Sequence, residues 1–180
     1  SYAGLLDRAE RLFLELLNTR GRIFEQSSRY LVELYEEEGE WGKILDLYRS
    51  KKLASGAALE RRIAQAVCEL AVQATASGDY YETQKLCRQA LKIDNRCARA
   101  YIVQGDLAYS QNEAREAIRC YLKAVEVDTQ AIVVVLEKMT GSFHDLGDVN
   151  GLISHLDRHW QSSHYVPALT ARTECIAEQQ

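Results

Sequence analysis

Proline is nearly absent from this chain: one of its 180 residues is a proline, and ten are glycines. So low a content excludes collagen-like, proline-rich and low-complexity sequences. Ala, Leu, Glu, Gln, Arg, Lys and Met together fill 94 positions. These residues lose little rotamer freedom in a helix, so the composition predicts an all-α protein.

Long apolar runs are also lacking. The longest is AIVVVL at 131–136, six residues, whereas a bilayer-spanning helix needs about 20. The N-terminal stretch carries charges from Asp7 onward and has no apolar core of the kind found in secretory leaders. We therefore expect no membrane span and no secretory signal within these residues.

Basic residues are fewer than acidic residues in this chain. The chain has 22 Lys and Arg against 26 Asp and Glu, a formal net charge of −4, and no block of five basic residues. Binding to a phosphate backbone requires a positive field. The sequence therefore predicts no nucleic-acid partner.

Cysteine pairs of the CxxC type are missing. The five cysteines stand at positions 68, 87, 97, 120 and 175, an odd number without metal-ligand spacing. This pattern favours a reducing compartment in which thiols act as small apolar side chains, over a disulfide framework or a zinc site.

Sequence motifs of catalysis are absent as well. The chain contains no GxSxG, no GxxxxGK[ST] and no GxGxxG. His155 and His159 stand four apart on a predicted helix, a spacing that could place two imidazoles on one metal. Residue 156 is Leu, not the Glu that a hydrolytic HExxH motif needs, so we predict neither a metal site nor an enzyme.

What the chain does contain is a turn that recurs. It stands at Gly4-Leu5, Gly39-Glu40, Gly78-Asp79, Asn112-Glu113 and Gly147-Asp148, at spacings of 35, 39, 34 and 35 residues. Gly and Asn tolerate the left-handed conformation that commonly ends a helix. The spacing therefore predicts a helical repeat of about this length.

Two helices per repeat follow from the residues around each turn. In the copy that starts at Ala98, small and aromatic residues recur at helical spacing on both sides of the turn, among them Gly105 and Tyr121. The small residues let paired helices approach closely, and the aromatic fills the remaining gap. The copy starting at Ala64 overlays this one without a gap.

This pattern resembles the tetratricopeptide repeat, a 34-residue helix-turn-helix unit. The resemblance implies an all-α solenoid, a right-handed superhelix of antiparallel helix pairs, forming one domain over residues 1–180. We expect a second helix of a truncated repeat at 1–20, and a longer loop near Ser55-Gly56. Repeats are predicted at 25–58, 64–97, 98–131 and 133–162, with a first helix of another truncated repeat at 167–180.

Several stretches resemble one family more closely, the lipopolysaccharide assembly protein B of Gram-negative bacteria. They are AGLLDRAERLF at 3–13, GEWGKILDLY at 39–48, AVCELAVQ at 66–73, KIDNRCARAYIVQGDLAYSQNEAREAIRCY at 92–121 and, more loosely, GSFHDLGDVNGLISHL at 141–156. The stretches follow the family's order along most of the chain.

The resemblance implies an adaptor and not an enzyme. Family members bring the deacetylase of the lipid A pathway to a membrane protease, and they hold their repeats in the cytoplasm through an N-terminal anchor in the inner membrane. They also carry a zinc module of two CxxC pairs. This chain has neither anchor nor CxxC pairs, so we expect a cytoplasmic repeat fragment of such a protein, without a cofactor of its own.

Partner binding in tetratricopeptide repeats takes place in a groove lined by the first helix of each pair. On this chain, the matching positions predict a groove that includes Arg29, Glu33, Glu36, Cys68, Val72, Arg99, Ile102, Asp106, Tyr109 and His144. The groove would be charged at its N-terminal end and more apolar in the middle, which suits a peptide or helix of mixed character. The alternative is an ordinary solvated face.

An acidic cluster, Glu33, Glu36, Glu37, Glu38 and Glu40, falls at the end of a predicted first helix, where negative charge opposes the helix dipole. Either the nearby Lys43, Arg49, Lys51 and Lys52 neutralise it, which we favour, or it meets a basic partner.

Three other functions stay open. The first is a general tetratricopeptide scaffold of another pathway, and the second is a repeat protein that forms a homodimer through exposed ends of the fragment or through the apolar 131–136 segment. The third is an enzyme accessory domain.

Overall fold

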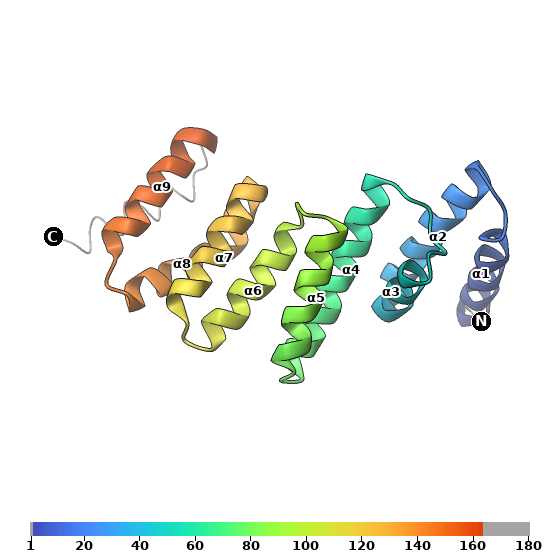
Figure 1. Ribbon diagram of the computed structural model, residues 1–180, viewed down its shortest axis with the longest axis horizontal. Helices are drawn as coiled ribbons and strands as arrows, with labels where there is room; N and C mark the ends of the chain where they lie inside the picture. Colours follow the sequence, from blue (N-terminus) through green and yellow to red (C-terminus); the bar gives the residue numbers. More distant parts are fainter. Residues whose placement is uncertain (1, 164–180) are drawn as a thin grey trace. The chain divides into compact units, whose positions relative to one another are not determined.

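A computed structural model describes the backbone of residues 2–163 and the side chains of residues 6–158. Every regular element in this range is helical (Figure 1). The helices are α1 (Tyr2–Leu16), α2 (Arg22–Glu38), α3 (Trp41–Arg49), α4 (Ala57–Ala76), α5 (Tyr80–Ile93), α6 (Ala98–Ser110), α7 (Ala114–Val127), the 3₁₀ turn η1 (Thr129–Ala131), α8 (Ile132–Asp145) and α9 (Val149–Ser163). The segment 167–180, predicted as a further first helix, and Pro167 within it lie outside the described residues.

The chain divides into two compact units, residues 1–97 and 98–180, and each is described by itself. Helices α1 to α5 belong to the first unit and α6 to α9 to the second. Their boundary coincides with the predicted start of a repeat at Ala98. Among the helices of residues 2–163, none is long and apolar enough to cross a membrane.

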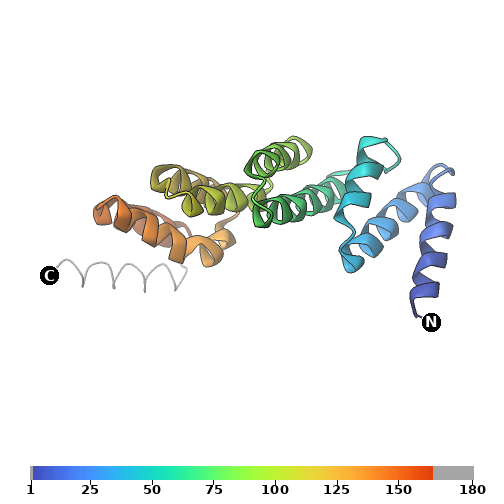
Figure 2. The ribbon, with the colours of Figure 1, turned by 90° about the horizontal axis from the view of Figure 1, so that it is seen from below.

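Adjacent helices pack in pairs within each unit. In the first unit α1 packs on α2 and α4 packs on α5, and in the second unit α6 packs on α7. Within each of the pairs α4–α5 and α6–α7, the two helices lie side by side in both views (Figures 1 and 2). The predicted all-α fold of tetratricopeptide-like helix pairs is thus confirmed.

The recurrent turn predicted from the sequence takes one conformation at four places. Gly39, Gly78, Asn112 and Gly147 all have a positive φ, between 58° and 81°. After each of them the next amide donates to the carbonyl five residues earlier, as from Glu40 to Tyr35 at 2.8 Å. This is the Schellman motif, in which a left-handed residue lets two amides satisfy carbonyls at the helix end.

The fifth predicted turn, at Gly4-Leu5, is wrong. Helix α1 already begins at Tyr2, so Gly4 stands inside it as the third helical residue. A glycine near a helix start costs little, because the first turn has few internal hydrogen bonds to lose. The glycine spacing therefore misplaces the start of this helix, although a helix does lie within residues 1–20.

Both units have an apolar core along their helix pairs. In the second unit Tyr121 of α7 is fully buried, and its ring lies where Gly105 of α6 has no side chain. A Cβ built at Gly105 would come within 2.5 Å of Tyr121 Cε1. The small and aromatic residues predicted to complement one another do so in the structure.

The α4–α5 pair fills the same positions differently. Ala71 and Cys87 stand where the next repeat has Gly105 and Tyr121, and both are fully buried. Thr83 is also fully buried. Its hydroxyl oxygen lies 3.1 Å from the hydroxyl oxygen of Thr75, and its hydroxyl donates to the Asp79 carbonyl at 3.0 Å. The hydroxyl is therefore satisfied at a site where the repeat pattern has alanine.

The predicted long loop joins α3 to α4 as residues 50–56. Ser28, fully buried in α2, accepts a hydrogen bond from the Ala54 amide at 3.0 Å and so holds the loop to the helix. Lys51 adopts a positive φ of 55°, and the Lys52 amide donates to the Leu47 carbonyl at 3.0 Å. Helix α3 therefore ends in the same Schellman motif as the four turns above. Helix α4 then begins at Ala57, earlier than the repeat start predicted at Ala64.

Candidate partner-binding surfaces

Helix α2 turns one side to solvent. Its buried residues are Ser27, Ser28, Leu31, Val32, Leu34 and Tyr35, and the opposite side carries Gln26, Arg29, Glu33 and Glu37 at spacings of three and four. We call these four residues the α2 stripe. Since helical neighbours at this spacing share a face, the stripe offers one continuous polar surface.

Glu36, next to this stripe, is held by Arg62 of α4. The Arg62 Nε donates to both carboxylate oxygens of Glu36, at 3.1 and 3.2 Å, and the Arg62 Nη2 bonds to Oε2 as well. The two side chains are 35% and 24% exposed, so the pair is partly shielded from water. Glu36 therefore joins α2 to α4, and it is less available to a partner than the sequence predicts.

Of the cations predicted to neutralise the acidic cluster, Lys43 does so in part. Its hydrogen bond to Glu10 raises its pKa most, and the charges of Glu40 and Glu38 help to raise it. Lys43 pairs with Glu10 of α1 at 3.2 Å, and Arg49 donates to Gln89 of α5 at 2.9 Å. The Tyr35 hydroxyl also donates to Glu10, at 2.8 Å, and this hydrogen bond together with Lys43 lowers the pKa of Glu10. The cation on Glu36 is Arg62, twenty-six residues away, and no local sequence pattern signals this pair.

On α4, the structure separates the two predicted groove residues. Val72 is 36% exposed, whereas Cys68 is fully buried, with its sulfur 3.7 Å from that of Cys97. Helix α4 packs against α2, α3 and α5, so only a narrow strip of it reaches solvent. Cys68 is thus a core residue and adds no surface for a partner.

Asp106 of α6 has a structural part in the second unit. Its Oδ1 accepts a hydrogen bond from the Tyr121 hydroxyl at 2.9 Å and pairs with Lys138 of α8 at 2.8 Å. Burial and this bond raise the pKa of Tyr121. Asp106 consequently joins three helices, α6, α7 and α8.

The other predicted residues of α6 differ in their exposure. Ile102 is 7% exposed and belongs to the core, while Arg99 is half-buried. Tyr109 is 39% exposed and rests on α8, where its hydroxyl lies 3.3 Å from the place a Cβ of Gly141 would occupy. Of these three residues, Tyr109 therefore presents most surface to solvent.

Helix α8 exposes an apolar strip. Val133 and Val134 are 54% and 60% exposed, and Glu137 and His144 lie farther along the exposed side. We call these four residues the α8 stripe. It differs in chemistry from the charged α2 stripe, so the two surfaces suit different partners.

The predicted histidine pair is only half described. His155 is partly buried beside Phe143, with ring centroids 5.8 Å apart, and burial lowers its pKa. The side chain of His159 lies outside the described residues. Among the side chains that the structure describes, no group of three or more His, Cys, Asp or Glu comes together as a metal site would require.

Comparison with known proteins bears on most of the chain. No family model matches it. The lipopolysaccharide assembly protein B of Escherichia coli K12 is 29% identical over 147 residues, which make up 81% of this chain and 37% of that protein. The protein of the same name from Haemophilus influenzae is 24% identical over 160 residues, 88% of this chain and 39% of that protein. The resemblance predicted from the sequence is thereby confirmed, and the chain spans less than half the length of these relatives.

Proposed function

We propose that the chain is an adaptor that regulates lipopolysaccharide synthesis by bringing the deacetylase of the lipid A pathway to a membrane protease. The observation that carries this proposal is the similarity to lipopolysaccharide assembly protein B over 81% of the chain. The exposed stripes on α2 and α8 support it, because they offer two chemically different surfaces.

The adaptor would act by proximity. When one chain holds two proteins, each meets the other at a raised effective concentration, and no new chemistry is required. The catalytic groups belong to the partners, so we propose no enzymatic activity and no cofactor for these 180 residues. From the similarity to lipopolysaccharide assembly protein B, we propose that the chain acts at the cytoplasmic face of the inner membrane.

The α2 stripe is proposed as a polar contact surface. Arg29, Glu33 and Glu37 are exposed and carry charges of both signs. Contacts between exposed charges weaken in salt and act mainly on the association rate. We therefore expect binding at this stripe to fall as ionic strength rises.

The two valines of the α8 stripe are proposed as an apolar contact surface. Val133 and Val134 lie more than half exposed, and covering them would remove apolar area from water. Binding at this stripe would depend little on salt, so salt dependence distinguishes the two surfaces.

The test measures binding of the purified deacetylase and of the purified protease to the immobilised chain, each over a range of salt. Charge reversal at Arg29→Glu with Glu33→Lys should weaken binding of one partner by about tenfold, a loss of about 1.4 kcal/mol. The matched control exchanges Lys123 and Glu126, an exposed ion pair on α7 that belongs to neither stripe. Failure of both purified proteins to bind would remove the proposal.

A second candidate is self-association, which the exposed Val133 and Val134 favour. A helix face that is apolar and uncovered can pair with a second copy of itself. Light scattering over a range of concentrations should then show a dimer that Val134→Lys abolishes. A monomer at every concentration would exclude this candidate.

A further inference from the structure

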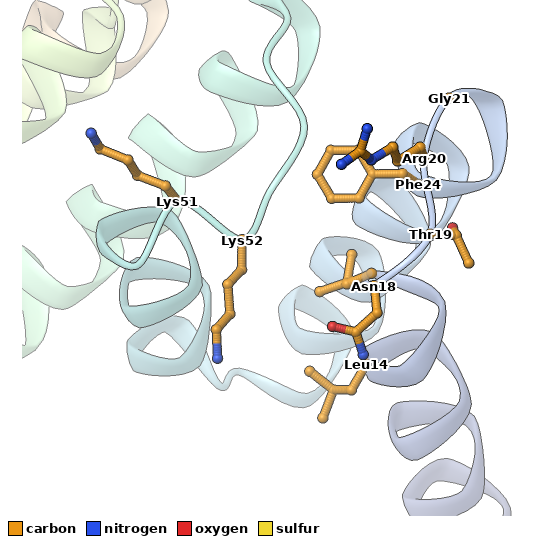
Figure 3. Close-up of a pocket in the computed structure, with 9 residues that line it drawn as sticks. Leu14, Asn18, Thr19, Arg20, Gly21, Phe24, Lys51 and Lys52 are labelled. Atoms are coloured by element: carbon orange, nitrogen blue, oxygen red, sulfur yellow. The ribbon is translucent and has the colours of Figure 1, made fainter.

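A pocket of about 590 Å³ lies in the first unit, between the turn that joins α1 to α2 and the residues that follow α3 (Figure 3). Its walls combine apolar and basic side chains, with no acidic residue among them. The apolar and basic residues are Leu14, Leu17, Phe24, Arg20, Lys51 and Lys52. Basic walls on a chain of net charge −4 indicate a local site for an anion.

Two of the cations line different walls of the pocket. Arg20 extends from the turn before α2 and lies beside Phe24, and Lys52 follows α3 and runs along it, so that its ammonium group lies away from Arg20 (Figure 3). Lys51 contributes to the wall but directs its ammonium group away from α1 and α2. Within the described part of the chain, Arg20 and Lys52 pair with no acidic side chain.

The remainder of the pocket is apolar. Leu14 is 37% exposed at its edge, and the partly buried Leu17 and Phe24 complete the apolar side. A small inorganic anion beside these cations would leave this surface in contact with water. A ligand that carries an apolar group beside its charge would cover it.

We propose that this pocket binds a phosphate ester that carries an apolar group. A phosphate monoester has a charge between about −1.5 and −2 at neutral pH, so the basic walls attract it more strongly than they attract a carboxylate of charge −1. Arg binds phosphate in a two-pronged geometry and Lys binds it as a point charge. Gly21, the residue before α2, also lines the pocket, so the positive end of the helix dipole adds to the same field.

Two sources supply this chemistry: the headgroup of a membrane lipid, and a free phosphorylated molecule with an apolar part. Both present the same chemistry to the walls of the pocket. The pocket shares no residue with the α2 stripe or the α8 stripe, so this proposal does not rest on the adaptor function proposed above.

Calorimetric titration with dihexanoyl phosphatidic acid, below its micelle concentration, tests the proposal on the whole 180-residue chain. Inorganic phosphate, octanoate, dihexanoyl phosphatidylcholine and a peptide ending in a leucine carboxylate are titrated alongside. We expect the phosphatidic acid to bind most tightly, since it alone combines the phosphate monoester with an apolar part. Equal or tighter binding of any of the other four would overturn the proposal.

Substitutions locate the site. Arg20→Gln with Lys52→Gln should weaken binding of the phosphatidic acid by about tenfold or more, because two positive charges are lost from the walls of the pocket. The control, Arg61→Gln with Lys92→Gln, removes the same charge from exposed positions of the same unit that do not line the pocket. An equal loss in both variants would show non-specific attraction and overturn the assignment.

Vesicles of phosphatidylcholine, with and without phosphatidic acid, separate the two sources. Sedimentation of the chain with the acidic vesicles that requires Arg20 and Lys52 supports a membrane lipid. Binding of the short-chain lipid without vesicle binding supports a free ligand. Vesicle binding that survives in the Arg20→Gln, Lys52→Gln variant, without binding of the short-chain lipid, contradicts the pocket.

Discussion

The contact between Gly105 and Tyr121 gives the sharpest prediction for stability. In the variant Gly105→Ala the new Cβ would meet Tyr121 Cε1 at 2.5 Å and Cδ1 at 2.7 Å. The ring has no simple escape, because it is fully buried and its hydroxyl is bonded to Asp106, which pairs with Lys138 of α8. A shift of the ring would therefore disturb three helices.

Two opposing effects set the magnitude. Ala in place of Gly inside a helix contributes roughly 0.5–1 kcal/mol of stability. Overpacking a tight core costs typically about 1–3 kcal/mol. We therefore expect Gly105→Ala to lower the free energy of unfolding by about 1–2 kcal/mol, measured by urea denaturation followed by circular dichroism.

Gly42 provides the matched control. It is the second residue of α3, and a Cβ added there would meet no atom within 4 Å, so Gly42→Ala should leave stability unchanged or raise it by less than about 0.5 kcal/mol. The neighbouring repeat offers a rescue, since it pairs Ala71 with Cys87 at the same two positions. Adding Gly105→Ala to a Tyr121→Cys background should then cost less than in the native chain. A Gly105→Ala variant that is as stable as the native chain would refute the reasoning.

Three further predictions concern a turn, a buried histidine and an ion pair. Lys51→Gly should raise the free energy of unfolding by about 1 kcal/mol, because a non-glycine residue at a φ of 55° is strained, whereas Lys51→Ala should give no such gain in the same urea assay. Burial, and then Arg158, lower the pKa of His155 below its usual 6.5, so its contribution to stability is complete above that pH and is lost as the pH falls below it. Urea midpoints between acid and neutral pH should consequently rise less steeply in His155→Gln than in the native chain, and parallel profiles would exclude this role. A double-mutant cycle of Glu36→Gln and Arg62→Gln should give a coupling of about 0.5–1 kcal/mol for this partly exposed pair, and a coupling of zero would contradict the contact.

The turns show how much of the fold could be predicted. A glycine or asparagine at a helix end can be recognised in the sequence, because few other residues adopt a positive φ. Four of the five predicted turns are found in the structure. Lys51 forms the same motif without that signal, since its strain is balanced by the packing of the loop against α2 and not by its own preference. Gly4 shows the converse, a glycine that the helix simply includes.

Surface chemistry is harder to predict than the helices. Repeat positions place Cys68 and Ile102 in the groove, but helices packed on several sides bury those positions. The Arg62–Glu36 pair and the pocket that Arg20 and Lys52 line depend on residues distant in the sequence, brought together by tertiary packing. No local pattern encodes such a contact, so it becomes visible only in the structure.

The central claim, that this chain holds two proteins at once, is tested most directly by sedimentation velocity of the chain mixed with the purified deacetylase and the purified protease. The adaptor proposal predicts a species containing all three proteins that is absent when the chain is left out. If the two proteins compete for the chain, or if no complex of three forms although each binds alone, the proposal is contradicted.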